Sequence, residues 1–479
     1  MTPDRAHVLD TLAVQRDRWK RRNRFYHAAL TRLYNFYIPK GQRVLEVGCS
    51  TGDLLAALDP ARGVGIDVSS RAIEQARQKY GQRPTLHFLC ADADADAFHL
   101  DETFDYVVLS DTIGFLGDVQ QCFENLRRVM QPHSRIIINS YSFVWELPLR
   151  LAEFLHLKQK QPLQNWLANA DIVNLLELAG FELVQREGFM LLPIHIPLLS
   201  SLCNGLLAKL PGLRALTLAQ FVIARPRGAP APAAAAATGY SVSIIVPARN
   251  EAGNIEAAIT RTPAFGAWQE FIFVEGHSKD ATWQEIQRVQ QAYPATRIKI
   301  MQQDGTGKKD AVCKGFAHAA GDILMILDAD LTMPPEDLPK FYRAIAENKG
   351  EFINGVRLVY PMEHEAMRLL NLFGNKFFSM AFSYLLNQPY KDTLCGTKVM
   401  WRTDWARIQA GQAYFGEFDP FGDFDMIFGA AKLLLKAAQI PIRYRARTYG
   451  TTQISRFAHG LLLLRMTWIG FLKFKWRLR

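Results

Sequence analysis

Short apolar segments alternate with helix-like stretches along both halves of the chain. Residues 216–226 have the pattern of a strand that closes the first half. Alternation of this kind indicates largely parallel sheets covered by helices, with ligands at the carboxyl ends of the strands. We therefore expect two α/β domains, each a three-layer sandwich. The other strand-like segments are residues 44–48, 63–67, 86–92, 104–110 and 135–140 in the first half and 243–248, 271–276, 298–303 and 322–330 in the second.

A Pro, Gly and Ala-rich segment at residues 225–239 separates the two patterned halves. It has no periodicity suited to a core and is typical of a linker. The 479 residues are also too many for one hydrophobic core. The predicted organisation is a first domain at 1–224, a linker at 225–239, a second domain at 240–457 and a tail at 458–479.

The composition is that of a folded globular protein, with 49% hydrophobic and 21% charged residues. Six cysteines are scattered without a C-x-x-C pair, which argues against a disulfide framework or a zinc site. The first 25 residues contain no apolar core, so they are not a secretory signal. These features predict a cytoplasmic location.

The C-terminal segment from Pro441 to Arg479 has nine Lys or Arg residues and no Asp or Glu. Its apolar run is interrupted by Arg465 and is too short to span a bilayer alone. A basic segment with Leu, Trp and Phe suits an anionic membrane face, here the inner face of the cell membrane. The alternative is a terminal helix packed on the last domain. No nucleic-acid motif accompanies the charge, so we expect no nucleic-acid partner.

In the first half, a strand leads through a glycine turn into a helix. Gly48 and Gly52 allow the backbone to approach a ligand, and the amides at the start of the helix can receive an anion. Asp67 ends the next strand, 19 residues after Gly48, where an acid can accept the two hydroxyls of a ribose. Asp92 ends the third strand and could meet an adenine amine. Asp111 ends the fourth and either faces the substrate or is a surface or core-edge acid.

This half resembles class I methyltransferases over residues 40–225. Their E-x-G-x-G-x-G motif stands here as Glu46-Val47-Gly48-Cys49-Ser50-Thr51-Gly52, with Ser50 in place of the middle glycine. The resemblance implies S-adenosylmethionine as cofactor, with Asp67 on the ribose and Asp92 near the adenine. A domain that has lost its ligand is the alternative. The predicted cofactor-binding residues are Glu46, Gly48, Cys49, Ser50, Gly52, Asp67, Asp92 and Asp111.

In the second half, three strands end in polar clusters at one edge of the predicted sheet. The sharpest is the pair Asp328 and Asp330, on either side of Ala329. Two such carboxylates after a buried strand suit a divalent cation that bridges a diphosphate. Oxygen ligands favour Mg²⁺ or Mn²⁺ over zinc. The other two clusters are Pro247, Arg249 and Glu251, and Glu275, Ser278 and Asp280.

These residues resemble family-2 glycosyltransferases, closest to the dolichyl- and polyprenyl-phosphate sugar transferases, over about residues 241–455. The resemblance implies a GT-A fold, a nucleotide-sugar donor, Mg²⁺ or Mn²⁺, and inversion at the anomeric carbon. Pro247, Arg249 and Glu251 would lie at the nucleotide. Glu275 would take the place of a base-contacting aspartate, which leaves base selectivity open. Asp328 and Asp330 would bind metal and diphosphate.

Two further segments carry the same resemblance. Gly307 and Lys308 match the family's G-K-G stretch, and Arg447, Gly450 and Thr452 match its R-x-x-G-x-S-K segment. Thr452-Gln453 replaces Ser-Lys there, so one phosphate contact is weaker or comes from Arg443 or Arg445. The predicted nucleotide-sugar-binding residues are Pro247, Arg249, Glu251, Glu275, Ser278, Asp280, Gly307, Lys308, Asp328, Ala329 and Asp330.

The acceptor is open between a sugar hydroxyl and a lipid phosphate. A hydroxyl needs a carboxylate base, for which Asp423 and Asp425 are candidates. A phosphate acceptor is already anionic and needs no base. Arginines such as Arg447, which can bind the phosphate, are then more important than a carboxylate. The basic run at 443–447 and the tail favour the phosphate. The apolar segment at 367–386 suits a lipid-facing helix or, alternatively, an ordinary core helix.

The sequence thus predicts a bifunctional enzyme, a methyltransferase joined to a metal-dependent, inverting sugar transferase that acts on a polyprenyl phosphate or glycolipid. One alternative is a transferase to a glycan hydroxyl with a non-catalytic cofactor-binding first domain. Another is a membrane-bound scaffold with relict sites. The intact Asp328–Asp330 pair argues against the scaffold.

Overall fold

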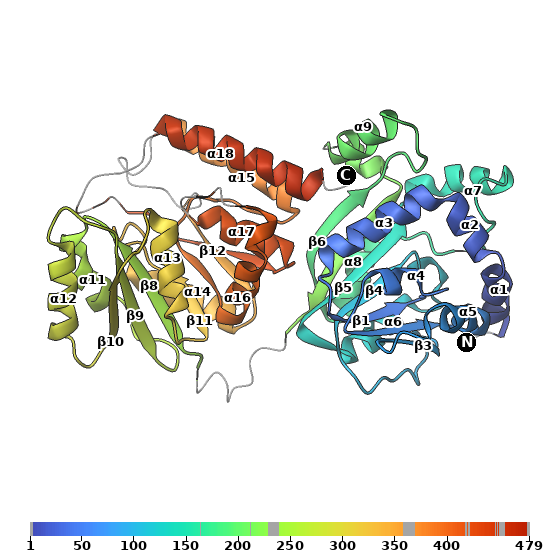
Figure 1. The fold of residues 1–479 in the computed structure, drawn as a ribbon, viewed down its shortest axis with the longest axis horizontal. Helices are drawn as coiled ribbons and strands as arrows, with labels where there is room; N and C mark the ends of the chain where they lie inside the picture. The colour runs from blue at the N-terminus through green and yellow to red at the C-terminus, as the bar shows by residue number, and fades with distance from the viewer. Residues whose placement is uncertain are drawn as a thin grey trace. The chain divides into compact units, whose positions relative to one another are not determined.

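The computed structural model describes residues 3–162, 164–210, 212–228, 239–357, 369–416, 419, 422–445, 447, 449 and 456–476. The chain divides into two compact units, Met1–Arg227 with Lys475–Arg479, and Gly228–Phe474. Each unit contains a seven-stranded mixed sheet (Figure 1). The two α/β units confirm the predicted fold class. Most of the predicted linker and the segment from Gly450 to Ser455 lie outside the described residues.

The first sheet has the strand order β3-β2-β1-β4-β5-β7-β6. Strands β1 to β5 pair in parallel, and β7 runs antiparallel to both of its neighbours. The strands expected in this half are all present, and β6 is an additional one. The bounds are β1 (Arg43–Val47), β2 (Arg62–Asp67), β3 (Leu86–Cys90), β4 (Phe104–Ser110), β5 (Met130–Tyr141), β6 (Phe181–Phe189) and β7 (Ala219–Pro226).

Helices pack on both faces of this sheet. On one face, the ring of Tyr34 in α3 lies 5.5 Å from that of Phe221, and its hydroxyl donates a hydrogen bond of 2.6 Å to Asn139. On the other face, buried side chains of α6 and α8 join the core around Leu45 and Val47. The helices are α1 (Pro3–Ala13), α2 (Arg16–Arg22), α3 (Arg24–Tyr37), α4 (Asp53–Ala57), α5 (Ser70–Tyr80), α6 (Val119–Arg128), α7 (Glu146–Phe154), α8 (Asn169–Leu178) and α9 (Leu199–Gly205).

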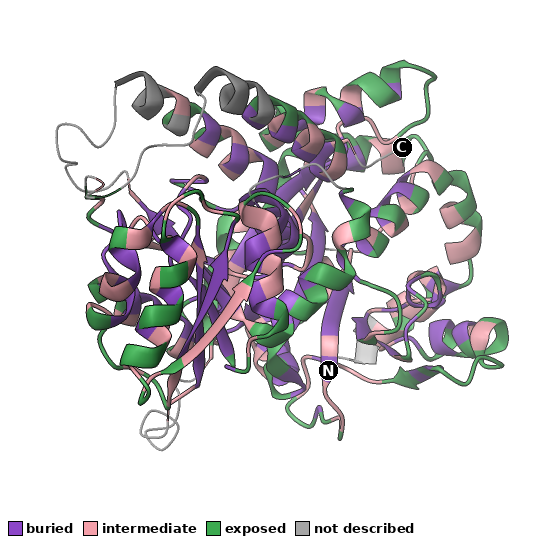
Figure 2. Ribbon diagram, turned by 60° about the vertical axis from the view of Figure 1, so that its left-hand side comes forward, coloured by how far each residue is buried: buried purple, intermediate pink, exposed green. Residues whose placement is uncertain are grey.

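The second sheet has the order β10-β9-β8-β11-β13-β12-β14. Here β13 is antiparallel to both β11 and β12, whereas the other pairs are parallel. Figure 2 shows the strands of both sheets as mostly buried. The bounds are β8 (Val242–Ala248), β9 (Gln269–Glu275), β10 (Arg297–Gln302), β11 (Ile323–Ile326), β12 (Phe352–Val356), β13 (Lys398–Trp401) and β14 (Ala437–Pro441).

This sheet is also covered on both faces. Gly315 of α13 packs on Ile245, whereas α11, α12 and α14 share a core with Ile244 and Val246, which point to the opposite face. The helices are α11 (Ile255–Thr260), α12 (Thr282–Ala292), α13 (Lys308–Ala317), α14 (Leu338–Ala346), α15 (Leu369–Leu386), α16 (Arg402–Ala410), α17 (Asp423–Lys432) and α18 (Arg456–Gly470).

The tail helix α18 packs against α15. Phe382 of α15 and Met466 of α18 are fully buried. In contrast, Met380 and Trp468 are 62% and 60% exposed. One face of the pair is therefore core, as the packed-helix alternative expected, and the other carries exposed apolar side chains. The membrane-facing alternative stays a prediction. No helix in the described part of the chain is long and apolar enough to cross a membrane.

Candidate functional sites

The glycine turn after β1 has a left-handed backbone at all three positions of the motif. Gly48, Ser50 and Gly52 have φ angles of 69°, 50° and 76°. A Cβ on Gly48 would lie 2.4 Å from Thr112 Oγ1, so this position requires glycine. Ser50 carries a Cβ in this left-handed region, which glycine occupies more easily, so its conformation costs strain.

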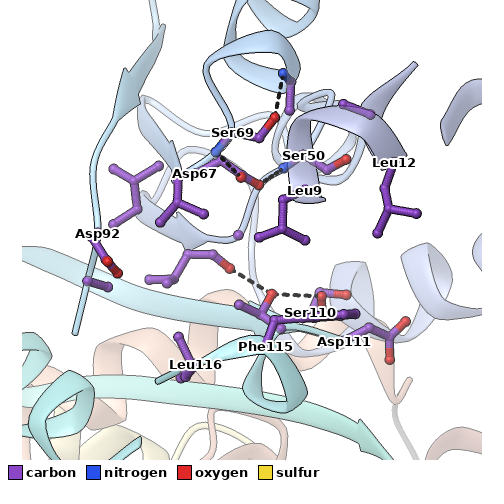
Figure 3. A pocket seen from close by; sticks show the side chains of 18 of the residues that line it. Leu9, Leu12, Ser50, Asp67, Ser69, Asp92, Ser110, Asp111, Phe115 and Leu116 are labelled. Atoms are coloured by element: carbon purple, nitrogen blue, oxygen red, sulfur yellow. Dashed lines mark hydrogen bonds between the residues drawn. The ribbon is translucent and has the colours of Figure 1, made fainter. Parts of the chain in front are cut away.

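Asp67 holds this turn in place. Its carboxylate accepts hydrogen bonds of 2.9 Å from the backbone N–H of Ser50 and from that of Ser69 (Figure 3). Burial raises its pKa above the usual value, although both N–H donors oppose the shift. The carboxylate lies at the wall of a pocket.

That pocket brings together five of the predicted cofactor residues. Figure 3 shows Ser50, Asp67, Asp92 and Asp111 around it, together with Leu9 and Leu12 of α1. No pattern in the sequence predicts that α1 forms part of the wall. The predicted residues that line the pocket are Gly48, Ser50, Asp67, Asp92 and Asp111.

Glu46, Cys49 and Gly52 are not among the residues that line the pocket. Glu46 is buried and accepts a hydrogen bond of 3.0 Å from the N–H of Leu55 in α4. Burial raises its pKa to about 8, which the nearby Lys20 opposes. This residue therefore fixes the start of the helix from behind the turn.

Asp111 lies at the end of β4 within a hydrogen-bonded network. Both of its carboxylate oxygens accept from the hydroxyl of Tyr26 at 3.1 Å, and Oδ1 accepts from Asn139 Nδ2 at 2.6 Å. Tyr34 donates to the same Asn139 side chain. Desolvation raises the pKa of Asp111 to about 6, although Tyr26 opposes the shift. It is therefore ionised at neutral pH and held in one orientation.

Lys20 of α2 ties the N-terminal helices to the glycine turn. Its ammonium lies 2.6 Å from Asp53 Oδ2 and donates to Thr51 Oγ1 at 3.0 Å. Burial would raise the pKa of Asp53, but Lys20 outweighs it and the pKa falls to about 2. Sequence patterns did not single out Lys20, because the surrounding basic run does not distinguish one cation from the next.

In the second unit, Arg447 joins two of the predicted clusters. Its Nη1 donates to Glu251 Oε1 at 2.9 Å and its Nη2 to Asp330 Oδ2 at 2.7 Å. The Glu251 side chain also accepts from Asn254 at 2.8 Å. Burial raises the pKa of Glu251 to about 7, against the effect of Arg447. Segments separated by 196 positions in the chain thus meet at the carboxyl ends of β8 and β11.

Asp328 pairs with Lys308, the first residue of α13. Lys308 Nζ lies 2.5 Å from Asp328 Oδ1. Burial would raise the pKa of Asp328, but the Lys308 ammonium outweighs it and the pKa lies below its usual value. Gly396, beside β13, permits this contact, because a Cβ there would lie 1.9 Å from Asp328 Oδ2. No sequence pattern predicts the role of Gly396, since the contact depends on an antiparallel strand distant in the chain.

Asp423 and Asp425, the alternative bases, have different partners. Asp423 Oδ1 lies 3.5 Å from the ammonium of Lys398, which is fully buried. Asp425 Oδ2 lies 2.6 Å from Lys309 Nζ and accepts from Gln412 at 3.1 Å. Because Lys308 and Lys309 are adjacent, Asp328 and Asp425 are held by neighbouring residues of one helix.

The third predicted cluster forms a turn after β9. Asp280 Oδ1 accepts from the N–H of Thr282 at 3.0 Å, and Ser278 Oγ accepts from the N–H of Asn250 at 3.0 Å. Glu275 accepts from the N–H of Ser278 at 2.5 Å. Arg249 is exposed beside this turn. The side chains of this cluster link the ends of β8 and β9 to each other.

The other predicted residues of the second unit lie near these clusters or outside the described residues. Gly307 has a φ of 87° at the start of α13, and Ala329 is buried between the paired aspartates. Pro247 is half-buried near the end of β8. The N–H of Arg445 donates to the Thr332 carbonyl at 2.9 Å. Gly450 and Thr452 lie outside the described residues.

A divalent cation would have two protein ligands here. The described part of the chain contains no group of three or more His, Cys, Asp or Glu side chains placed to hold a metal ion. Mg²⁺ nevertheless binds through one or two carboxylates when phosphates and waters complete its coordination. Asp328 and Asp330 fit that donor set, although each now faces a cation, Lys308 or Arg447.

Comparisons with known proteins agree with the division of the chain into two units. Residues 45–136 match the family described as Methyltransferase domain, and residues 243–404 match Glycosyl transferase family 2. Dolichol-phosphate mannosyltransferase of Pyrococcus furiosus is 36% identical over 120 residues, or 25% of this chain and 33% of the relative. The Saccharomyces cerevisiae enzyme of that name is 35% identical over 111 residues, or 22% of this chain and 41% of the relative.

A third relative is the undecaprenyl-phosphate 4-deoxy-4-formamido-L-arabinose transferase of Salmonella paratyphi A, 31% identical over 120 residues, or 24% of this chain and 36% of the relative. The chain thus spans well under half the length of these relatives. Among solved structures, a putative methyltransferase complexed with the Haloferax volcanii Trm112 activator is 19% identical, with a TM-score of 0.36. That match covers 47% of this chain and 98% of the other.

The two family matches occupy different units. The first falls on β1 to β5 with the glycine turn and the pocket, and the second on β8 to β13 with the Asp328–Asp330 pair. The chain therefore joins a methyltransferase domain to a family 2 glycosyltransferase domain, and the latter is homologous to polyprenyl-phosphate sugar transferases.

Proposed function

We propose that the second unit transfers a sugar from a nucleotide-sugar donor to a polyprenyl phosphate at a membrane surface, with inversion. The observation that carries this proposal is the position of Arg447 between Glu251 and Asp330. It puts a guanidinium beside the paired aspartates, where the diphosphate of the donor would lie. The relatives named above act on dolichol and undecaprenyl phosphates, as their names state.

In the proposed reaction, an oxygen of the lipid phosphate attacks the anomeric carbon. The bond from that carbon to the diphosphate breaks, and the nucleoside diphosphate leaves with the electron pair. The nucleophile is already anionic, so no base has to remove a proton. Mg²⁺ or Mn²⁺ held by Asp328 and Asp330 would neutralise charge on the leaving diphosphate. Lys308 and Arg447 add positive charge at the same place.

The exposed apolar side chains of α15 and α18, with the basic residues of the tail, support a peripheral place on the inner face of the membrane. Deleting residues 458–479 would remove the buried Met466 and Phe474 and damage the core. A sharper variant is Leu464→Ser/Trp468→Ser/Leu472→Ser, because all three side chains are exposed. It should lower binding to anionic vesicles while the thermal transition stays within a few degrees.

For the first unit, we propose binding of S-adenosylmethionine in the pocket at Asp67 and methyl transfer to an acceptor. Alignment of the acceptor with the sulfonium supplies much of the rate. Asp111 is placed to take a proton from an acceptor hydroxyl or amine, because it lies on the pocket wall and is ionised at neutral pH. The orientation set by Tyr26 and Asn139 would support that role.

The sugar-transfer proposal is tested by incubating the protein with a radiolabelled nucleotide-sugar donor, with and without polyprenyl phosphate, and measuring where the label goes. Label should move into an organic-extractable product only when the lipid is present. Label on a water-soluble glycan would instead support transfer to a sugar hydroxyl. Asp423 would then be the first base to replace, since it lies with Lys398 near the Asp328–Lys308 pair.

A further inference from the structure

Two segments of the first unit carry apolar side chains that face solvent. They are residues 143–157 and residues 194–216, which together we call the apolar cap. Leu147 and Phe154 in the first segment are 77% and 79% exposed, and Leu198 in the second is 88% exposed. Isolated exposed apolar residues are ordinary on protein surfaces. A concentration of them in two segments indicates an interaction surface.

Helix α7 presents the reverse of the usual amphipathic arrangement. Leu147, Leu151 and Phe154 stand at spacings of four and three residues, on one face of the helix, and all are exposed. Leu149, on another face, is buried against the unit. The helix thus has one apolar side packed inward and a second turned outward. A helix with an apolar face open to water is what membrane-surface helices display.

The two segments of the cap lie together and beside the cofactor pocket. Trp145 Nε1 donates a hydrogen bond of 2.8 Å to the Leu216 carbonyl, which joins the first segment to the second. Just beyond the cap, Gln159 Nε2 donates to the carbonyl of Leu12 at 3.1 Å. Leu12 and Gln161 both line the pocket. The outward apolar surface therefore borders the site at which the methyl acceptor has to arrive.

The charge around the cap is positive. Residues 194–216 contain no Asp or Glu. In the other segment, Glu146 and Glu153 are each 2.6 Å from a cation, Arg150 and Lys158. Basic residues of α2 and the start of α3 lie at its edge, because the ring of Phe25 is 5.4 Å from that of His195. The exposed cations of α2 and of the first turn of α3, which lead into Phe25, are Arg18, Arg21, Arg22 and Arg24.

This combination favours a bilayer over a second copy of the chain. A twofold interface would bring the arginine-rich edges of both copies into one buried surface, and this concentration of like charge costs energy. Anionic lipid headgroups complement them, and the apolar side chains can enter the acyl boundary. In Figure 1, α7 and α9 lie on the upper side of the first unit, and α2 lies just below α7 at its edge.

We propose that the apolar cap is a bilayer-binding surface of the methyltransferase unit, separate from α15 and α18. It follows that the methyl acceptor is an amphipathic, lipid-anchored molecule with a hydroxyl or amine, presented from the membrane. The acceptor class rests on the proposed methyltransferase function. The bilayer-binding surface does not depend on that function.

The test uses the full chain and vesicles of phosphatidylcholine with or without phosphatidylglycerol. The cap variant is Leu147→Ser/Leu151→Ser/Phe154→Ser, placed in the background Leu464→Ser/Trp468→Ser/Leu472→Ser so that tail binding is removed. Its matched control is Leu178→Ser, an equally exposed leucine at the end of α8. The cap variant should lose at least tenfold in affinity for anionic vesicles and the control less than twofold.

Unchanged sedimentation of the cap variant would overturn the proposal. So would a change from dimer to monomer by light scattering, since that would assign the cap to a second copy. Calorimetry with S-adenosylmethionine should give the same affinity for variant and wild type, which shows that the fold is intact. If wild type itself gives no heat, the methyltransferase function fails while the vesicle result stands.

The acceptor class has its own readout. Wild-type protein, tritiated S-adenosylmethionine and a total membrane lipid extract should give label in the organic phase. The Leu464→Ser/Trp468→Ser/Leu472→Ser background is the reference, and the cap variant should lose most of the label that this background gives. Label that remains in the aqueous phase with a soluble extract, and is unaffected by the cap variant, would overturn the assignment of a lipid-anchored acceptor.

Discussion

The backbone N–H of Ser50 donates a hydrogen bond of 2.9 Å to Asp67 Oδ2. The acid expected at the cofactor ribose is therefore also the residue that holds the glycine turn. Its second oxygen accepts from Ser69 in the same way. The site is organised before the cofactor binds, because one carboxylate connects the ends of β1 and β2.

Replacing Asp67 with Ala should weaken S-adenosylmethionine binding by about 1–3 kcal/mol, because ribose hydrogen bonds and the tie to Ser50 are both lost. Titration calorimetry measures the change. Glu74→Ala, at an exposed position on α5, is the control and should bind as wild type does. Equal affinity of Asp67→Ala and wild type would contradict the assignment.

Replacing Ser50 with Gly should raise stability. The left-handed conformation costs a residue with a Cβ about 1–2 kcal/mol, whereas glycine adds about 0.5–1 kcal/mol of chain entropy to the unfolded state. The net gain of about 0–1.5 kcal/mol should raise the melting temperature of the first unit by about 2–4 °C for each kcal/mol gained. Ser50→Ala keeps the strain and is the control. A lower melting temperature for Ser50→Gly would show that the serine is not strained.

Site residues that stand directly after a single strand could be predicted from the sequence. Asp67 and the Asp328–Asp330 pair stand at strand ends, and periodicity locates strand ends. Gly396 could not be found in this way, because its need for a missing Cβ arises only when β13 pairs antiparallel with β11. The same limit applies to α1, whose place on the pocket wall depends on tertiary packing. Local patterns also could not show that Glu46 faces α4 rather than the cofactor.

The pKa of Asp111 predicts a pH dependence of stability. Its folded value is about 6 and its usual value is 3.8, so the folded state keeps a proton that the unfolded state releases. Stability should therefore fall as pH rises from about 4 to about 6, and level off above that. Asp111→Asn removes this contribution. Urea unfolding at pH 4, 5, 6 and 7 should show a smaller fall for the variant than for wild type. Parallel curves would contradict the shifted pKa.

The paired aspartates predict metal dependence of sugar transfer. EDTA should abolish activity, and Mg²⁺ or Mn²⁺ should restore it. Asp330→Ala should lose at least about 100-fold, because charge stabilisation by a bound metal is worth several kcal/mol. Asp304→Ala removes an exposed acid from the same unit and should leave the rate unchanged. Full activity of Asp330→Ala in chelator would exclude a metal at this site.

Arg447 gives the sharpest test of the second unit. Its two terminal nitrogens donate to different carboxylates, Glu251 at 2.9 Å and Asp330 at 2.7 Å. A lysine has one ammonium on a flexible stem and cannot hold both oxygens in the same geometry. Arg447→Lys keeps the charge yet should lower kcat/KM by about 100-fold, a cost near 3 kcal/mol. Planar, two-point contact with phosphate oxygens is lost as well.

The matched control is Arg288→Lys, since Arg288 also lies between two carboxylates, Glu256 and Glu285, but at an exposed site. That variant should change the rate less than twofold, because surface ion pairs contribute little. Radiolabel transfer into the organic phase, measured over a range of polyprenyl phosphate concentrations, separates the two effects of Arg447→Lys. A rise in KM for the lipid would place the guanidinium at the acceptor phosphate, whereas a fall in kcat alone would place it at the leaving diphosphate. If both variants behave alike, the contact between Arg447 and Asp330 has no part in catalysis, and Lys308 becomes the cation that faces the diphosphate.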